Sequence, residues 1–301
     1  MSVAAPSDSY PLYERLFMRA ALAGLVLATT PQHLNIHSLP EPNGLARLVD
    51  LTFLTNATAL DACHYLLLVA LGFYVAGVLL WLALPVLLLI NVAVNSLLNS
   101  QGAIQHSSQI VSLVLLAQTG ACCFGWWRQR RCGENAVATE ARAIWWSQQT
   151  IAATYFVAGL TKLLHTHGTW VFRARFIGVQ IFKTAYHAYY NWLDPSGLDW
   201  RLGIAQFAAA HGALVAVIAA TGLLLELLAP LMLLNRWSGL MLGCAIIAFH
   251  VVLGQVMLLG FLFNQLLVLV FVVRPLFWIT QMFRTWHSVS SGPSRRTRSA
   301  V

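Results

Sequence analysis

Seven ionisable side chains stand inside apolar stretches of this 301-residue chain, namely His64, His106, Lys162, His165, His211, Glu226 and His250. Ionisable groups are costly in an apolar environment, so each is a candidate for function. Lys162 is the sharpest candidate, because the chain has only one other lysine, Lys183, beside many arginines. An amine among apolar side chains can release its proton and act as a base, whereas a guanidinium cannot. The structural alternative is a lysine that extends its amine to the lipid headgroups.

Spacing adds two neighbours to Lys162. Gln148, Tyr155 and Lys162 follow one another at intervals of seven, so they project from nearly one face of a helix. Tyr155 is therefore a candidate to contact whatever Lys162 binds.

Glu226 is too deep in its apolar segment for a short side chain to reach water, so its carboxylate must be paired, hydrated or protonated. A structural partner and a catalytic role are both open. His211 stands fifteen residues earlier, so the two side chains could face one interior. His250 is followed by Gln255, and a lone intramembrane histidine commonly makes an interhelical hydrogen bond. The sequence has no metal-ligand spacing, and we expect no metal site.

Composition decides the class of protein. Hydrophobic residues make up 58% of the chain and charged residues 9%, and the mean hydropathy is +0.69. Soluble domains carry nearer 25% charged residues, because a surface facing water needs them. The chain is therefore predicted to be an all-α, polytopic membrane bundle in contact with the lipid bilayer. Its net charge of +8 is attributed to cytoplasmic loops, so nucleic acid is not an expected partner.

A membrane-spanning helix needs about 20 mostly apolar residues. On this criterion we expect about eight spans: 13–30, two helices within 62–99 divided at 82–84, 105–125, 143–165, 208–233, 239–258 and 261–281. A basic loop is expected at 126–140. Residues 1–284 are predicted to form one domain, and 285–301 a basic disordered cytoplasmic tail.

The arginines predict the orientation. With a cytoplasmic N-terminus, the loop 126–140, Arg236 and the tail all lie on the cytoplasmic side, as the positive-inside rule requires. Both termini are then cytoplasmic. This orientation places Lys162 near the outer end of the fifth span. Glu226 instead lies about seven residues, roughly 10 Å, from the inner end of the sixth.

The long segment 166–205 contains a two-faced pattern. Polar residues recur at helical intervals, with an apolar set on the other side that includes Phe172, Phe176, Val179 and Tyr190. This pattern predicts an interfacial amphipathic helix that lies on the membrane. It serves either as a scaffold element or as a lid beside a lipid-facing pocket.

Three stretches carry a family resemblance. Residues 155–163 match the pattern Y-F-x-A-G-x-x-K-L and are followed by Trp170. Residues 222–227 match G-L-L-L-acid-L, and Phe249-His250 with Gln255 and Gly260 matches F-H-x-x-x-x-Q-x-x-x-x-G. In these stretches, within about 100–265, the chain resembles the horizontally transferred transmembrane (HTTM) domain family. This domain is related to the membrane domain of vitamin K-dependent gamma-carboxylases.

The resemblance implies a function for the site. In the carboxylases a lysine deprotonates a reduced quinone, and oxygen chemistry on that quinone then generates a strong base. Carried over, Lys162 and His250 would be catalytic, together with His106, whose match is weaker. Tyr155, Glu226, Gln255 and His211 would line the site for the reduced quinone or another lipid ligand.

The chain also departs from the carboxylase pattern. No segment could replace the large extramembrane domain that holds the carboxylases' protein substrate, and three extra residues separate Lys162 from Trp170. Two interpretations therefore remain. One is a quinol- or lipid-dependent membrane enzyme, either carboxylase-like or an oxidoreductase. The other is a non-catalytic immunity, export or maturation partner of a secreted peptide or protein. Both predict a multi-pass protein of the bacterial inner membrane.

Overall fold

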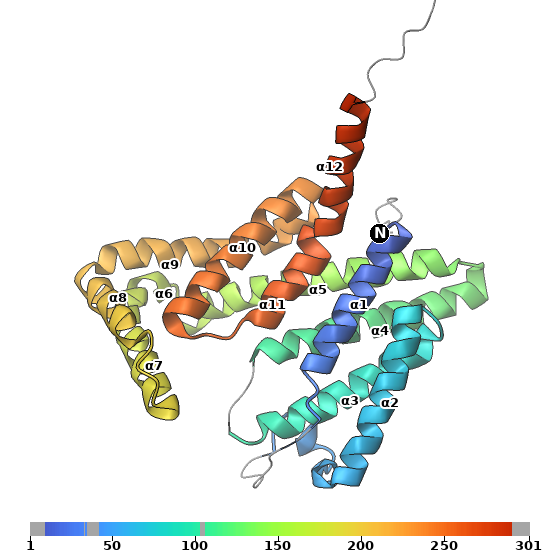
Figure 1. Ribbon diagram of the computed structural model, residues 1–301, viewed down its shortest axis with the longest axis horizontal. Coiled ribbons are helices and arrows are strands. Elements are labelled where there is room, and N and C mark those ends of the chain that lie inside the picture. The colour runs from blue at the N-terminus through green and yellow to red at the C-terminus, as the bar shows by residue number, and fades with distance from the viewer. Residues whose placement is uncertain (1–9, 33, 35–41, 103–105, 291–301) are drawn as a thin grey trace, which may run out of the picture.

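A computed structural model describes residues 10–32, 34, 42–102 and 106–290 of the chain. Every regular element in these ranges is a helix, which confirms the predicted all-α class. Figure 1 shows the helices gathered in an elongated bundle, with α7 and α8 extending from one end.

The N-terminal half consists of α1 (Leu12–Ala28), α2 (Ala57–Ala76), α3 (Leu80–Asn99), α4 (His106–Cys132) and α5 (Ala136–His165). Two short 3-10 helices, η1 (Gly44–Arg47) and η2 (Thr52–Thr55), lie between α1 and α2.

The C-terminal half begins with short helices and ends with longer ones. Its elements are α6 (Trp170–Arg173), η3 (Ala174–Phe176), α7 (Ile177–Trp192), α8 (Leu198–Ala210), α9 (Gly212–Leu227), η4 (Ala229–Leu233), α10 (Arg236–Met257), α11 (Leu262–Leu267), the π-helix η5 (Val268–Val273) and α12 (Pro275–Ser290). Helix α12 thus extends into the predicted tail. Residues 291–301 of that tail lie outside the described residues.

Within the described part of the chain, five helical stretches are long and apolar enough to cross a membrane: Ala57–Ala76, Leu80–Asn99, Ser107–Cys132, Arg236–Met257 and Leu262–Trp286. The bent pair α8 and α9 makes a sixth if it counts as one span. The predicted first and fifth spans, in α1 and α5, are not among them. The predicted number of eight is therefore not confirmed.

The second and third predicted spans divide earlier than expected. The break lies at Gly77, which has a left-handed φ of +75° that favours glycine, and not at 82–84. Pro85 lies inside α3, in its second turn. It has no N–H to donate to the carbonyl of Trp81 four residues earlier, so α3 includes the proline at the cost of one helical hydrogen bond.

The predicted basic loop 126–140 is wrong. Helix α4 continues to Cys132 and α5 begins at Ala136, so the connection consists of residues 133–135. Asn135 caps α5 by accepting a hydrogen bond from the Ala138 N–H at 2.8 Å. Glu134 forms ion pairs with arginines on both helices, Arg128 and Arg142, and these pairs stabilise the tight connection.

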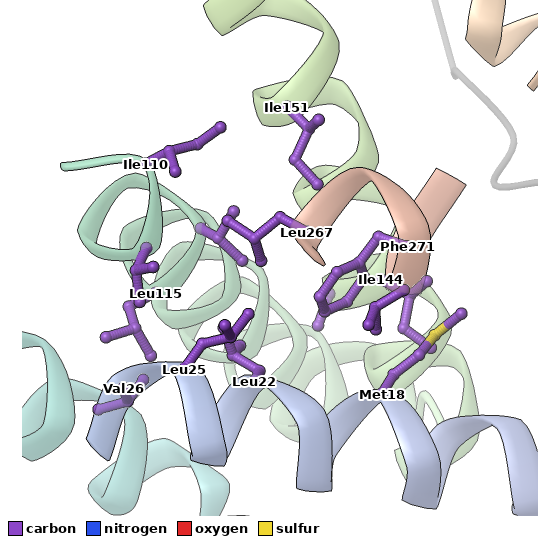
Figure 2. Close-up of a cluster of buried hydrophobic side chains, with 14 of the residues drawn as sticks. Met18, Leu22, Leu25, Val26, Ile110, Leu115, Ile144, Ile151, Leu267 and Phe271 are labelled. Carbon is purple, nitrogen blue, oxygen red and sulfur yellow. The ribbon is translucent and has the colours of Figure 1, made fainter. Parts of the chain in front are cut away.

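The main core joins elements from both halves of the chain (Figure 2). Its labelled side chains come from α1, α4, α5, α11 and η5: Met18, Leu22, Leu25, Val26, Ile110, Leu115, Ile144, Ile151, Leu267 and Phe271. All are buried. The C-terminal helices therefore close the bundle against the first.

Charged residues in α1 are buried in ion pairs. Arg15 and Arg19 both bind Glu140 of α5, and Glu14 binds Arg274 at the start of α12. These pairs compensate charges that would otherwise be costly inside the bundle. They also hold α1 to both α5 and α12.

A buried polar network ties the end of α1 to α3 and α4. The Asn91 amide donates to the hydroxyls of Thr29 and Thr30 at 3.0 and 2.9 Å. Its carbonyl oxygen accepts from Ser112 at 2.6 Å. Asn91 is fully buried, so these bonds satisfy all the groups that its side chain presents.

The predicted sixth span, 208–233, is interrupted twice. Helices α8 and α9 meet at His211 with a bend of 101°, and after α9 the chain continues as the 3-10 helix η4. One continuous helix over about 208–233 was expected there. Pro230, near the start of η4, cannot donate a helical hydrogen bond, and this ends α9 at Leu227.

The predicted amphipathic helix corresponds to α7, which packs against α8 as a hairpin (Figure 1). Gly178, Ile181 and Ala185 are the buried face of α7. The apolar set of the sequence pattern stays exposed, including Phe172, Phe176, Val179, Tyr190 and Trp192. Helix α7 thus has a packed side and an exposed side. On the exposed side Lys183 lies one turn from Val179, so apolar and polar residues are not separated into two faces as the sequence pattern predicted.

Candidate functional site

Lys162 and Glu226 form the centre of the site. The Lys162 ammonium lies 2.5 and 2.6 Å from the two carboxylate oxygens of Glu226, so both oxygens accept from the same group. The Glu226 side chain is 8% exposed, and that of Lys162 is 33% exposed. One partner is therefore buried while the other reaches the molecular surface.

A glycine allows the two helices to approach this closely. Gly159 lies one turn before Lys162 on α5, and a Cβ there would lie 3.1 Å from Cβ of Glu226 and 3.2 Å from the Leu227 side chain. Any larger residue would push α9 away from α5. The sequence shows this glycine inside the matched stretch 155–163, but its contact partner is visible only in the fold.

The contact between Lys162 and Glu226 contradicts the depths in the membrane that the sequence predicted for them. Lys162 was expected near the outer end of its span and Glu226 near the inner end of the next, yet the two side chains are in contact. The reason is that α9 ends at Leu227, so Glu226 lies in its last turn beside Lys162. The η4 segment that follows then packs along α5.

Tyr155 and His250 adjoin the pair. Both are buried, and their rings meet edge to face with centroids 5.4 Å apart. Both lie within electrostatic range of Glu226. The His250 ring donates from Nδ1 to the Ile246 carbonyl oxygen at 2.8 Å, because a carbonyl oxygen can only accept. In the neutral ring Nε2 therefore carries a lone pair.

Two polar groups beside these rings lack a hydrogen bond of normal geometry. They are the Tyr155 hydroxyl and Oδ1 of Asn264, both inaccessible to solvent. The two side chains interact with each other at a less favourable geometry. Buried polar groups in this condition mark a place where a polar ligand atom would be favourable.

Trp170 lies on the exposed side of Lys162. The ammonium is 5.2 Å from the centroid of the indole ring, which is within cation–π range. Trp170 begins α6, so the turn that ends α5 places the indole over the amine. The ring stabilises a positive charge on Lys162.

The structure separates the other predicted site residues from this cluster. His211 is exposed at the α8–α9 bend, at the opposite end of α9 from Glu226, and its ring stacks on Phe207. The Gln255 side chain is exposed, and its backbone carbonyl accepts from Arg201. His106 begins α4, and its side chain lies outside the described residues.

Four of the seven predicted site residues therefore come together: Lys162, Glu226, Tyr155 and His250. Asn264 also lies beside Tyr155 and was not among the predicted site residues. Arg274 was missed although it lies inside the predicted eighth span, where the rule that selected the seven ionisable residues also applies.

In the described part of the chain, no group of three or more histidine, cysteine or acidic side chains is arranged to hold a metal ion. All five cysteines are free thiols. The chemistry of the site therefore has to be argued from the amine, the carboxylate, the imidazole and the phenol.

Comparison of the chain with protein-family models, with curated proteins and with solved structures found no match.

Proposed function

We propose that the chain is a membrane enzyme that removes a proton from the hydroxyl group of a lipid-soluble substrate, with a reduced quinone as the substrate class. The observation that carries this proposal is the Lys162–Glu226 pair, which sits at the surface of a bundle of long apolar helices. The resemblance of residues 155–163 to HTTM domains supports the same assignment.

The proposed proton transfer requires only the side chains of Lys162 and Glu226. Either an ammonium with a carboxylate or an amine with a carboxylic acid can occupy this geometry, because either group can carry the proton that lies between them. In both distributions the pair accepts one more proton from the substrate hydroxyl. It ends as an ammonium and a carboxylic acid, and the substrate leaves as its anion.

The neighbours favour that transfer. The indole of Trp170 stabilises the ammonium that forms. Tyr155, His250 and Asn264 offer hydrogen-bonding groups to the polar end of a bound substrate. In this role the Lys162 amine is the catalytic base when Glu226 holds the shared proton, and Glu226 takes the substrate proton when Lys162 holds it. Tyr155, His250 and Asn264 orient the substrate.

We further propose the location that this function requires. About eight segments cross the bacterial inner membrane, with both termini in the cytoplasm, as the distribution of arginines indicates. Helices α1 and α5 would complete the count, because the ion pairs of α1 neutralise its charges within the bundle.

The test is quinol turnover by the purified full-length protein in lipid nanodiscs. We expect turnover to fall at least 100-fold in Lys162→Met and to persist in Lys183→Met, because Lys183 lies exposed on α7 away from the pair. Equal turnover in the two variants would remove Lys162 from the mechanism.

A second function is supported by a different surface. The exposed surface of α6, η3 and α7 offers five large side chains, Phe172, Phe176, Val179, Tyr190 and Trp192, to a partner. This surface suits a non-catalytic partner of a secreted peptide. Sensitivity of a deletion strain to such a peptide, rescued fully by Lys162→Met, would favour this function over catalysis.

A further inference from the structure

A surface of paired aromatic and basic side chains lies where α4 ends, at the opposite end of α5 from Lys162. Three aromatic residues of α4 are each followed four residues later by an arginine: Phe124 and Arg128, Trp126 and Arg130, Trp127 and Arg131. Residues four apart are neighbours on a helix. The three guanidinium carbons accordingly lie over their rings, at 5.9, 4.0 and 5.4 Å from the ring centroids. We call these six side chains the basic surface of α4.

The length of α4 puts this surface at the level of the lipid headgroups. The stretch Ser107–Cys132, which is apolar enough to cross a membrane, has 26 residues, and about 20 suffice to cross the hydrocarbon core. The surplus of about six residues extends beyond the core at the arginine end, because charged side chains are costly inside hydrocarbon. Each ring then lies one turn deeper than its arginine, which is the usual arrangement of tryptophan and arginine at a membrane interface.

The basic surface of α4 is open to a ligand. Trp126 and Trp127 are 41% and 48% exposed, and the side chain of Arg128 is 45% exposed. Trp81, near the start of α3, is also exposed, and its ring stacks on that of Trp126 with centroids 6.4 Å apart. The exposed rings therefore continue from α4 onto α3 as one patch, and a patch of this kind indicates an interaction surface.

Positive charge is in excess at this surface. Arg128 shares the carboxylate of Glu134 with Arg142 of α5. Arg130 and Arg131 are exposed and form no ion pair with any described residue. Four arginines thus face one carboxylate, which leaves an excess of three positive charges in the described part of the chain.

Neither the next acid on α5 nor the helix ends remove this excess. Glu140 is already bound by two arginines of α1, Arg15 and Arg19. The C-terminus of α4 carries about half a negative charge, but the N-terminus of α5 carries about half a positive charge. Only residues 133–135 separate the two ends, so their charges cancel. The excess of arginine charge therefore attracts anions to this surface.

We propose that the basic surface of α4 binds the headgroups of anionic phospholipids in the cytoplasmic leaflet. The planar guanidinium groups donate to the phosphate oxygens, and the exposed indoles contact the glycerol region one turn deeper. Repulsion between like charges argues against a second copy of the chain as the occupant, and the position at headgroup level argues against a soluble partner. The inference shares with the proposed function only the membrane location and does not involve Lys162.

The test is lipid binding by the full-length protein, measured by native mass spectrometry. Phosphatidylglycerol and phosphatidylcholine with identical acyl chains are compared, and sn-glycerol 3-phosphate serves as the soluble phosphate. We expect at least a tenfold preference for phosphatidylglycerol. The double variant Arg130→Gln/Arg131→Gln should weaken phosphatidylglycerol binding about fivefold, because it removes the two arginines that have no ion pair. Arg130→Lys/Arg131→Lys keeps the charge and should weaken binding about twofold, since an ammonium lacks the planar fork of donors.

Arg173→Gln/Arg175→Gln is the matched control, because it also removes two exposed arginines, and Arg175 likewise lies over an aromatic ring, at 4.8 Å from that of Phe176. Both positions follow the far end of α5. This variant should change binding less than about twofold, and so should Lys162→Met. Equal binding of the two lipids, or equal losses in the two arginine-to-glutamine variants, would overturn the proposal. Binding of glycerol phosphate as tightly as the lipid would overturn it in favour of a soluble phosphate ester. A dimer that is lost only in Arg130→Gln/Arg131→Gln would instead assign the surface to a second copy of the chain.

Discussion

The ammonium of Lys162 is held by both carboxylate oxygens of Glu226, at 2.5 and 2.6 Å, across 64 residues of sequence. The contact joins the last turns of α5 and α9. It brings the chain's rarest basic side chain together with a buried acid beside Tyr155 and His250. The predictions below test this pair, the packing that permits it and the surrounding fold.

The first prediction concerns the stability of the pair. Lys162→Met should destabilise the protein by about 2 kcal/mol, because it leaves the Glu226 carboxylate buried and unpaired. This is less than for a fully buried pair, since Lys162 is one-third exposed. The double variant Lys162→Met with Glu226→Gln should recover most of the loss. Thermal unfolding in detergent measures both, and a double variant as unstable as the single one would contradict this account.

The second prediction concerns proton sharing. Glu226→Gln should lower quinol turnover at least tenfold, because the amide cannot accept the shared proton. Glu226→Asp keeps the acid at a shorter reach, so we expect partial activity and a changed pH profile of turnover. If Glu226→Gln and Glu226→Asp gave the same pH profile of turnover, Glu226 would hold Lys162 in position without sharing its proton.

The third prediction concerns the close approach of α9. Gly159→Ala places a methyl group 3.1 Å from Cβ of Glu226, so we expect a loss of about 1–3 kcal/mol and lower turnover. Gly72→Ala on α2 is the control, because no atom lies within 4 Å of the added carbon. It should be neutral or stabilise the helix by up to about 1 kcal/mol. Similar unfolding temperatures for the two variants would show that α9 can move away from α5 without loss of stability.

The fourth prediction concerns the buried network at the end of α1. Asn91→Ala removes the partners of Thr29, Thr30 and Ser112, so we expect a loss of about 2–3 kcal/mol. Asn191→Ala on the exposed face of α7 should cost less than about 0.5 kcal/mol. The comparison uses unfolding in detergent. A small effect of Asn91→Ala would mean that water replaces its hydrogen bonds.

The fifth prediction concerns the exposed apolar side chains of α7. In a variant without reactive native cysteines, Val179→Cys should be protected from a charged maleimide in nanodiscs, because we place this exposed apolar side chain in the lipid. Asn191→Cys, which is exposed and lies about 120° round the same helix from Val179, should react rapidly. In small detergent micelles without lipid, we expect Val179→Cys to react only modestly faster than in nanodiscs. Rapid labelling of both positions in nanodiscs would place α7 away from the bilayer.

Much of the fold could be predicted from local sequence. Helix α1 begins and ends close to the expected residues 13–30, and α10 nearly coincides with 239–258. These limits follow from apolar length and from breakers such as Pro31 and Asn235, which act over one or two turns. The connection at 133–135 was missed, because a run of arginines marks the cytoplasmic side but does not interrupt a helix.

The site could be predicted only in part. The scarcity of ionisable residues in apolar segments selected Lys162, Glu226 and His250, since such residues are costly unless they serve a purpose. The same rule also selected His211, which the structure places at an exposed bend. This rule considers only the cost of placing an ionisable residue in an apolar segment. It contains no information on which residues of other helices lie beside it.

The sequence by itself determined the helical class, the apolar segments and the identity of the rare ionisable residues, because composition and periodicity act locally. The tertiary structure alone decided that Lys162 meets Glu226 and that Arg274 pairs with Glu14. Those contacts depend on how far one helix is shifted along another. That shift is set by close packing, at Gly159 and at the break between α9 and η4, and by contacts between residues far apart in the chain.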